Sequence, residues 1–185
     1  MPQALIPLAQ GCEELEAVTL IDLLRRANIT VITAGLDEQP VKASRGVTLI
    51  ADMTLDEALK QNFDIIVLPG GVAGADNLNQ DPRIQKLLQE MAQQGKFTAA
   101  ICAAPKVLAN AGLLTHKSAT SYPGVLEQLQ LPQTQLLAQP VVRDDRVITS
   151  RGPGTAMDFA LELIEILVDK STRDQVEAGL VRSVA

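Results

Sequence analysis

Short apolar runs that alternate with helical patterns are the feature of this chain that most constrains its fold. Four runs have the length and composition of buried strands, and turn residues follow each of them. Such runs, separated by helices, indicate a parallel sheet covered on both faces. We therefore predict an α/β fold with a mostly parallel central sheet. The four runs are Ala4–Leu8, Thr30–Leu36, Phe63–Gly71 and Phe97–Ile101.

The segments between these runs show helical and hairpin patterns. Apolar spacing near 3.6 residues predicts helices at about Glu13–Arg26, Pro82–Gln94, directly after Ile101, at Thr155–Val168 and at residues 171–181. Alternating patterns around turn residues predict two hairpins. These hairpins span residues 41–52, turning near Arg45 and Gly46, and residues 141–155, turning at Asp144 and Asp145.

Length and composition indicate one globular domain over residues 1–185, with a core built from aliphatic side chains. Hydrophobic residues make up 46% of the chain and aromatic residues only 2%. The net charge of −6, with no basic run, argues against nucleic acid as a direct partner. No apolar run reaches the roughly 18 residues of a membrane span, and the first residues lack a leader pattern. We expect a cytoplasmic protein that does not enter a membrane.

The few cysteine and histidine residues argue against a metal site. Cys12 and Cys102 lack the CxxC spacing of redox pairs and zinc knuckles. His116 is the sole histidine, and it follows Gly112 in a polar stretch, so we expect it to be solvated rather than catalytic. The sequence therefore gives no reason to expect a metal or another cofactor.

Cys102 has two interpretations. It follows an apolar run and precedes a helical pattern, between pairs of alanines, and such small neighbours permit a sharp turn that exposes a nucleophile. The N–H groups of the following helix would then lower the pKa of the thiol. The alternative is an inert cysteine in the core. Position alone does not separate the two.

Glu16 is the acid expected to lie in the protein interior. On the first helix it falls within the apolar arc, between Leu20 and Leu23, whereas Glu14 and Asp22 face the other side. Burial raises the pKa of a carboxyl group, so Glu16 could keep its proton and donate a hydrogen bond to a Cys102 thiolate. The alternative is an ordinary acid of the first helical turn.

Glycine-rich turns follow the strands that flank Cys102. Gly70 and Gly71 allow the backbone to approach a ligand and to direct an N–H group at a developing oxyanion. The turn "SRGPGT" at residues 150–155 could bind an anion. Because ligands of open α/β sheets bind beyond the carboxyl ends of the strands, we expect these segments to converge.

Taken together, these residues resemble the ThiJ/PfpI superfamily, and within it the branch of the Parkinsonism-associated deglycase and bacterial ThiJ-like proteins. The matching segments occur in the family's order from Gly11 to Leu161. The resemblance implies a flavodoxin-like three-layer sandwich of the class I glutamine amidotransferase type, usually a homodimer. The segments are "GCEELEAV", "DLLRRANI", "SRGV", "IIVLPGG", "AAICAAP" and "TSRGPGTAMDFAL".

The resemblance also implies roles for single residues. The family's reactive cysteine falls on Cys102 and its protonated acid on Glu16, with backbone oxyanion donors at Gly71 and Ala103, beside Gly70. Two family arginines fall on Arg45 and on Arg26, the latter expected to reach the pocket of a dimer partner.

Two positions bear on how far that resemblance extends. Ala103 stands where the protease-like branch has a histidine, which weighs against a Cys–His peptidase. Tyr122 stands where many members of the deglycase branch carry a histidine, so a base at that place is absent.

Two functions are implied by the resemblance. The first is a deglycase or glutathione-independent glyoxalase that acts on methylglyoxal-type aldehydes and glycated amines, as part of carbonyl and oxidative stress protection. The second is a redox sensor or redox-regulated chaperone that uses an oxidisable Cys102, with Cys12 either a resolving partner or a packed thiol. Both use the same residues, so the sequence leaves the choice open.

Overall fold

A computed structural model describes residues 1–182 and is built around a seven-stranded sheet in the order β10-β11-β7-β6-β1-β2-β5. Every neighbouring pair in it is parallel except β10 and β11. The mostly parallel sheet predicted from the sequence is confirmed. Its strands are β1 (Gln3–Leu8), β2 (Thr30–Gly35), β5 (Met53–Thr54), β6 (Ile65–Leu68), β7 (Phe97–Ile101), β10 (Val141–Asp144) and β11 (Val147–Ser150).

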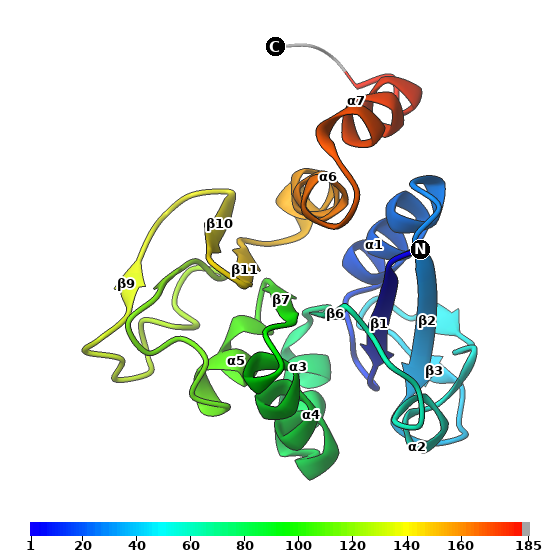
Figure 1. The fold of residues 1–185 in the computed structure, drawn as a ribbon. Helices are drawn as coiled ribbons and strands as arrows, with labels where there is room; N and C mark the ends of the chain where they lie inside the picture. Colours follow the sequence, from blue (N-terminus) through cyan, green and yellow to red (C-terminus); the bar gives the residue numbers. More distant parts are fainter. Residues whose placement is uncertain (183–185) are drawn as a thin grey trace.

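Helices cover both faces of this sheet, which gives the three layers of the predicted sandwich (Figure 1). On one face α1 (Glu14–Arg26) packs against α6 (Ala156–Leu167), and α7 (Lys170–Gly179) packs on α6. On the other face lie α3 (Val72–Gln80), α4 (Pro82–Gln93) and α5 (Pro105–Asn110), in mutual contact. No helix within residues 1–182 is long and apolar enough to cross a membrane.

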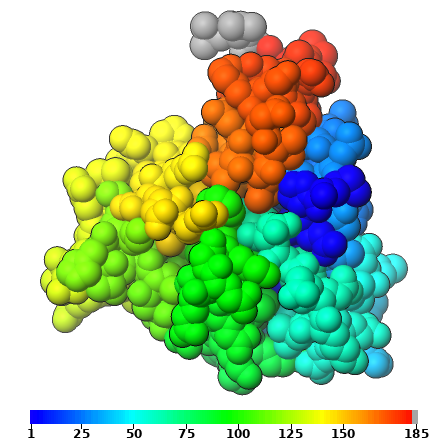
Figure 2. Space-filling model, in the orientation of Figure 1, coloured from blue at the N-terminus to red at the C-terminus, as the bar shows by residue number. Residues whose placement is uncertain are grey.

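The remaining elements are two hairpins and several short strands and turns. Strands β3 (Val41–Lys42) and β4 (Thr48–Leu49) form the first predicted hairpin, and β10 and β11 form the second. The space-filling view shows the segment between β7 and β10 as a flank of its own (Figure 2, green to yellow). Within it lie β8 (Ser118–Ala119) and β9 (Gln135–Leu136), whereas the 3₁₀ turn η1 (Pro153–Thr155) follows β11 and leads into α6.

The core is aliphatic, as the composition predicts. All residues of β6 are buried, and β1 is buried from Ala4 onward, because central parallel strands are covered on both faces. Phe159 of α6 is the largest fully buried side chain, in a surrounding of leucine, isoleucine, valine and alanine. The third strand is shorter than predicted, because the chain turns out of the sheet after Leu68, before Gly70 and Gly71.

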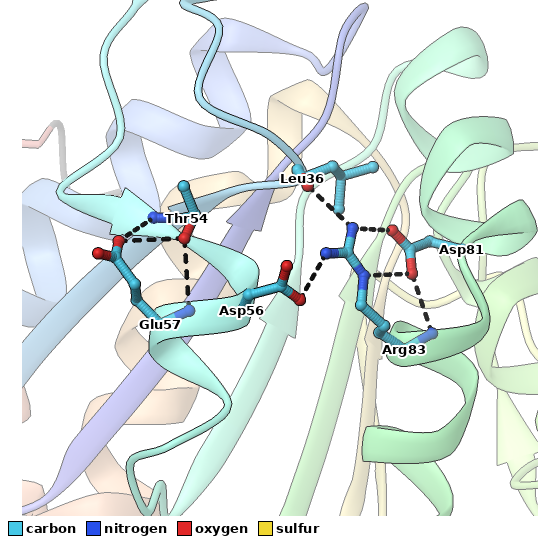
Figure 3. A network of polar contacts seen from close by, with 6 residues as sticks. All are labelled: Leu36, Thr54, Asp56, Glu57, Asp81 and Arg83. Carbon is cyan, nitrogen blue, oxygen red and sulfur yellow. Dashed lines mark hydrogen bonds and ion pairs between the residues drawn. The ribbon is translucent and has the colours of Figure 1, made fainter.

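Arg83 connects three segments near the carboxyl end of β2 (Figure 3). Its guanidinium binds Asp81 through both carboxylate oxygens, at 3.0 and 2.6 Å, and also Asp56, at 2.8 Å. A further N–H donates to the carbonyl of Leu36. Asp81 caps α4, Asp56 lies in α2 (Leu55–Ala58) and Leu36 follows β2. The cluster therefore joins the start of α4 to the segments before and after the β3–β4 hairpin.

Candidate active site

Cys102 lies on a sharp turn between β7 and α5. Its φ is +64°, in the left-handed region that residues other than glycine adopt at a cost of about 1–3 kcal/mol. Two backbone hydrogen bonds hold it there, from the Cys102 N–H to the carbonyl of Ser150 (3.0 Å) and from the Tyr122 N–H to the carbonyl of Cys102 (2.8 Å). The sharp turn expected from the small neighbours is present, and Ala103 and Ala104 are buried in it.

A cavity of about 890 Å³ opens in front of this turn. The carboxyl ends of β1, β6, β7 and β11 all contribute to it, so the predicted convergence of strand ends is observed. Cys102 itself is 9% exposed and faces this cavity from its floor. The lining consists of Gln10, Gly11, Glu13, Lys42, Ala43, Ser44, Arg45, Gly46, Gly71, Val72, Ala73, Cys102, Ala103, Tyr122, Val125 and Pro153.

Glu16 lies beneath the cavity and is fully buried, as its place in the apolar arc of α1 predicts. Its Oε2 accepts a hydrogen bond from the Gly70 N–H at 2.8 Å. Its Oε1 is buried without a hydrogen-bond partner in the part of the chain that the structure describes. An unpaired carboxylate oxygen in the interior is costly, which favours a protonated group or a donor at this place.

The thiol and the carboxyl each change the pKa of the other. Burial raises the pKa of Glu16 to about 7, a change opposed by the Gly70 N–H and by the Cys102 thiol. Burial, followed by the negative charge of Glu16, raises the pKa of Cys102 to about 12. Burial thus acts on Glu16 in the predicted direction, whereas the predicted fall in the thiol pKa is wrong, because burial and the neighbouring carboxylate outweigh the N–H groups of Gly71 and Ala103.

Two backbone amides lie close to the Cys102 sulfur and partly oppose that rise. The N–H groups of Gly71 and Ala103 both lower the thiol pKa. Gly71 caps the N-terminus of α3 with a φ of +85°, and a Cβ there would lie 2.4 Å from the carbonyl oxygen of Gly11. Glycine is therefore required at this position. The two amides are placed where an oxyanion formed at the sulfur could accept from both.

Gly70 provides the space between the thiol and the carboxyl. A Cβ at this position would lie 2.6 Å from the Cβ of Cys102, 2.6 Å from Glu16 Oε2 and 2.9 Å from the carbonyl oxygen of Ile101. We expect Gly70→Ala to lower the free energy of unfolding by about 1–3 kcal/mol, measured by chemical denaturation, because the extra methyl group overpacks this contact. Gly179→Ala is the control, since no atom lies within 4 Å of its added Cβ. Equal stability of the two variants would contradict the proposed crowding.

The raised pKa of Glu16 predicts a specific dependence of stability on pH. The folded carboxyl, with its pKa near 7, keeps a proton that the unfolded one, near 4.5, has released. Stability from this group is therefore greatest below about pH 4.5 and falls as pH rises through 7, by on the order of 3 kcal/mol in total. We expect Glu16→Gln, which cannot titrate, to lose this part of the slope in denaturation curves. The exposed Glu38→Gln should retain it, and a slope unchanged in Glu16→Gln would contradict the account.

The structure brings some of the other predicted residues to the site and leaves others apart. Arg45 lines the cavity and is exposed. Arg26 lines a separate cavity beside α7 and pairs with Asp22 at 2.7 Å, so within one chain it does not reach Cys102. His116 is exposed and outside the lining, as expected for a solvated histidine.

Cys12 and the "SRGPGT" turn, two further candidates from the sequence, offer the site neither a second thiol nor free amides at Gly152 and Thr155. Cys12 is fully buried in the hydrophobic core, where burial raises its pKa to about 11, and it is not part of the lining. In the turn, the Gly152 N–H donates to Thr155 Oγ1, and the Thr155 N–H donates back to the Gly152 carbonyl. These two amides are therefore engaged within the turn rather than open to an anion.

The β3–β4 hairpin is held against the site by acids that sequence reasoning did not assign. Glu14 accepts from the backbone N–H groups of Arg45 and Val47, and Ser44 Oγ donates to both Glu13 and Glu14. The acidic run at the start of α1 was the signal available for this contact. Within residues 1–182 no group of three or more His, Cys, Asp or Glu side chains is arranged to hold a metal ion.

The chain is similar in sequence and in fold to known proteins. The model of the DJ-1/PfpI family matches residues 2–166. The chain is 42% identical over 179 residues to Protein dj-1beta of Drosophila melanogaster, with 96% of each chain covered. The crystal structure of that Drosophila protein superimposes with a TM-score of 0.94, covering 99% of both chains at 40% identity.

Two further relatives bear on chemistry. A protein of Caenorhabditis elegans named glutathione-independent glyoxalase DJR-1.2 is 37% identical over 158 residues, which cover 85% of this chain and 84% of the relative. An oxidized form of Toxoplasma gondii DJ-1 superimposes with a TM-score of 0.94 over 100% of both chains, at 35% identity.

Proposed function

The chain belongs to the DJ-1/PfpI family, and from this premise we propose that it is a cysteine-dependent, glutathione-independent glyoxalase. It would act on methylglyoxal-type aldehydes and on their early adducts with protein or nucleotide amines. The observation that carries the proposal is the pairing of the Cys102 thiol with a buried acid, Glu16, whose pKa lies near neutral pH. A group with such a pKa can both accept and return a proton at pH 7.

The raised thiol pKa changes the role expected of Glu16. A thiol with a pKa near 12 is protonated at neutral pH, so it needs a base at the moment it attacks a carbonyl carbon. In our proposal the Glu16 carboxylate takes the thiol proton as the sulfur–carbon bond forms. The resulting oxyanion of the hemithioacetal accepts hydrogen bonds from the N–H groups of Gly71 and Ala103.

The remaining steps use the same acid. Glu16 first returns the thiol proton to the oxyanion, which gives the neutral hemithioacetal. As a carboxylate again, it takes the proton from the carbon bonded to sulfur and delivers it to the neighbouring carbon, which converts the hemithioacetal of methylglyoxal to a thioester of lactate. Water then hydrolyses the thioester, releasing lactate and restoring the thiol. In sum, one methylglyoxal and one water become one lactate and one proton, with no external oxidant or reductant.

The family resemblance supports a homodimer as the working form, in the cytoplasm. Arg26, which lines a different cavity from that of Cys102 in its own chain, would then approach the Cys102 cavity of the partner. Analytical ultracentrifugation tests this part of the proposal, and a monomer at micromolar concentration would contradict it.

The test of the activity is the appearance of lactate from methylglyoxal in the absence of glutathione. We expect many lactate molecules for each protein chain, quantified by NMR at pH 7.5. Loss of methylglyoxal without lactate would contradict the proposal, because surface lysine and arginine side chains also consume this aldehyde.

A second candidate, a redox sensor, is supported by one observation, the similarity to an oxidized form of the Toxoplasma protein. The raised thiol pKa argues against it, since peroxide reacts with thiolates. Mass spectrometry after mild peroxide treatment separates the two functions. Rapid oxidation confined to Cys102 would favour the sensor, and an unmodified Cys102 would exclude it.

A further inference from the structure

The cavity in front of Cys102 is much larger than methylglyoxal, and one of its walls is apolar. At about 890 Å³ it is in the size range of sites for whole small-molecule ligands rather than for three-carbon aldehydes. Its residues divide into two groups. The strand end after β1 and the β3–β4 hairpin contribute polar groups, whereas the start of α3 and the segment after Tyr122 contribute apolar ones.

The apolar wall contains two large side chains, Val72 and Tyr122, that are exposed rather than buried. Val72 is 72% exposed and Tyr122 is 52% exposed, although Gly71 and Ser121, which directly precede them, are buried. Val125 and Pro153 complete this wall. Large apolar side chains left uncovered beside a reactive group indicate a binding surface for an apolar group.

Tyr122 is tied to the reactive turn. Its N–H donates to the carbonyl of Cys102, so its backbone moves with the nucleophile. Its ring packs toward Gly152, where an added Cβ would lie 3.4 Å from Tyr122 Cδ2. The ring is half exposed and lines the same cavity as Cys102, so an apolar group of a molecule bound at the sulfur could cover it.

From these observations we propose that Tyr122, with Val72 and Val125, selects 2-oxoaldehydes whose substituent is aromatic or branched and apolar. The aldehyde carbon would lie at Cys102, while the substituent would cover the ring of Tyr122 and the side chain of Val72. Burying a phenyl group there removes apolar surface from water, which a methyl group does to a much smaller extent. This inference rests on the proposed glyoxalase function and adds the class of substrate.

The test compares phenylglyoxal with methylglyoxal in the wild type and in Tyr122→Ala. The intrinsic reactivities of the two aldehydes cancel when the ratio of their kcat/KM values is compared between proteins. We expect this ratio to fall by about tenfold in Tyr122→Ala, the effect typical of losing an apolar contact. Tyr122→Phe, which keeps the ring, should retain the wild-type ratio, as should Leu59→Ala, an exposed apolar residue outside the cavity.

A second measurement keeps the two proposals separable. Phenacyl bromide and bromoacetone alkylate a thiol by the same step, in which a sulfur–carbon bond forms, bromide leaves and the thiol proton is lost to the medium. We expect the ratio of their rates at Cys102, followed by mass spectrometry, to fall in Tyr122→Ala as well. If no lactate forms but the ratio of alkylation rates still falls in Tyr122→Ala, only the glyoxalase proposal is contradicted. Unchanged ratios in Tyr122→Ala in both assays would overturn the assignment of the apolar wall.

Discussion

Cys102→Ser is expected to reduce lactate formation from methylglyoxal by at least about a thousandfold, because removing a nucleophile eliminates the covalent route. Serine retains the size of cysteine and can keep the backbone hydrogen bonds of the turn to Ser150 and Tyr122. Its hydroxyl, however, is a much weaker nucleophile and a poorer leaving group in the hydrolysis step. Near-normal secondary structure and stability should accompany the loss.

Cys12→Ala provides the matched control for this result. Cys12 is the other cysteine, and it is fully buried in the core outside the cavity lining. We expect the free energy of unfolding of Cys12→Ala to be lower by about 1 kcal/mol, because the substitution leaves a small void. The variant should keep most of its turnover. Parallel losses of activity in the two variants would show that the cysteine requirement is structural.

Glu16→Leu is expected to lower the pKa of Cys102 and yet to reduce turnover by a hundredfold or more. Removing the carboxylate removes a negative charge that raises the thiol pKa, so the thiolate forms more readily. Removing the same group also takes away the base that accepts the thiol proton and moves it during rearrangement, an effect of about 10²–10⁴. The thiol pKa is measured by thiolate absorbance, and turnover by lactate.

A fall in both the thiol pKa and the turnover of Glu16→Leu distinguishes a base from a hydrogen-bond donor at this position. A protonated Glu16 that donates to a thiolate predicts the reverse sign, a rise of the thiol pKa in Glu16→Leu. The conservative Glu16→Gln, which can still accept the Gly70 N–H, separates loss of the charge from loss of packing. A thiol pKa that rises in both variants would contradict the role of base assigned to Glu16.

Much of the fold could be predicted because the central elements have strong patterns. The strand Phe97–Ile101 and the helix beginning at Pro82 are found where apolar spacing places them. Helix α3 was missed, since "VAGADNLNQ" contains a glycine, several polar residues and little apolar periodicity. The two-residue strands β8 and β9 have no period to detect, and their pairing depends on contacts distant in the sequence.

The site could be predicted in its residue types but not in its electrostatics. The position of Glu16 on the apolar arc indicated its burial, and the alanines around Cys102 indicated a sharp turn. The sign of the thiol pKa shift depends on how deeply the sulfur is buried and on its separation from Glu16, and both are determined by tertiary packing that brings α1 to the turns after β6 and β7. The part of the apolar wall formed by Val72 could not be predicted either, because Val72 belongs to α3, the helix that was missed.

The most direct test of the proposed chemistry is a count of lactate molecules formed per Cys102 under excess methylglyoxal, with wild type and Cys102→Ser compared at equal methylglyoxal loss. The account predicts that lactate accumulates linearly well beyond one molecule per chain in the wild type and stays at the buffer rate in Cys102→Ser. Equal lactate in the two proteins, or formation in the wild type that stops at one equivalent, would contradict the assignment of Cys102 as a catalytic nucleophile.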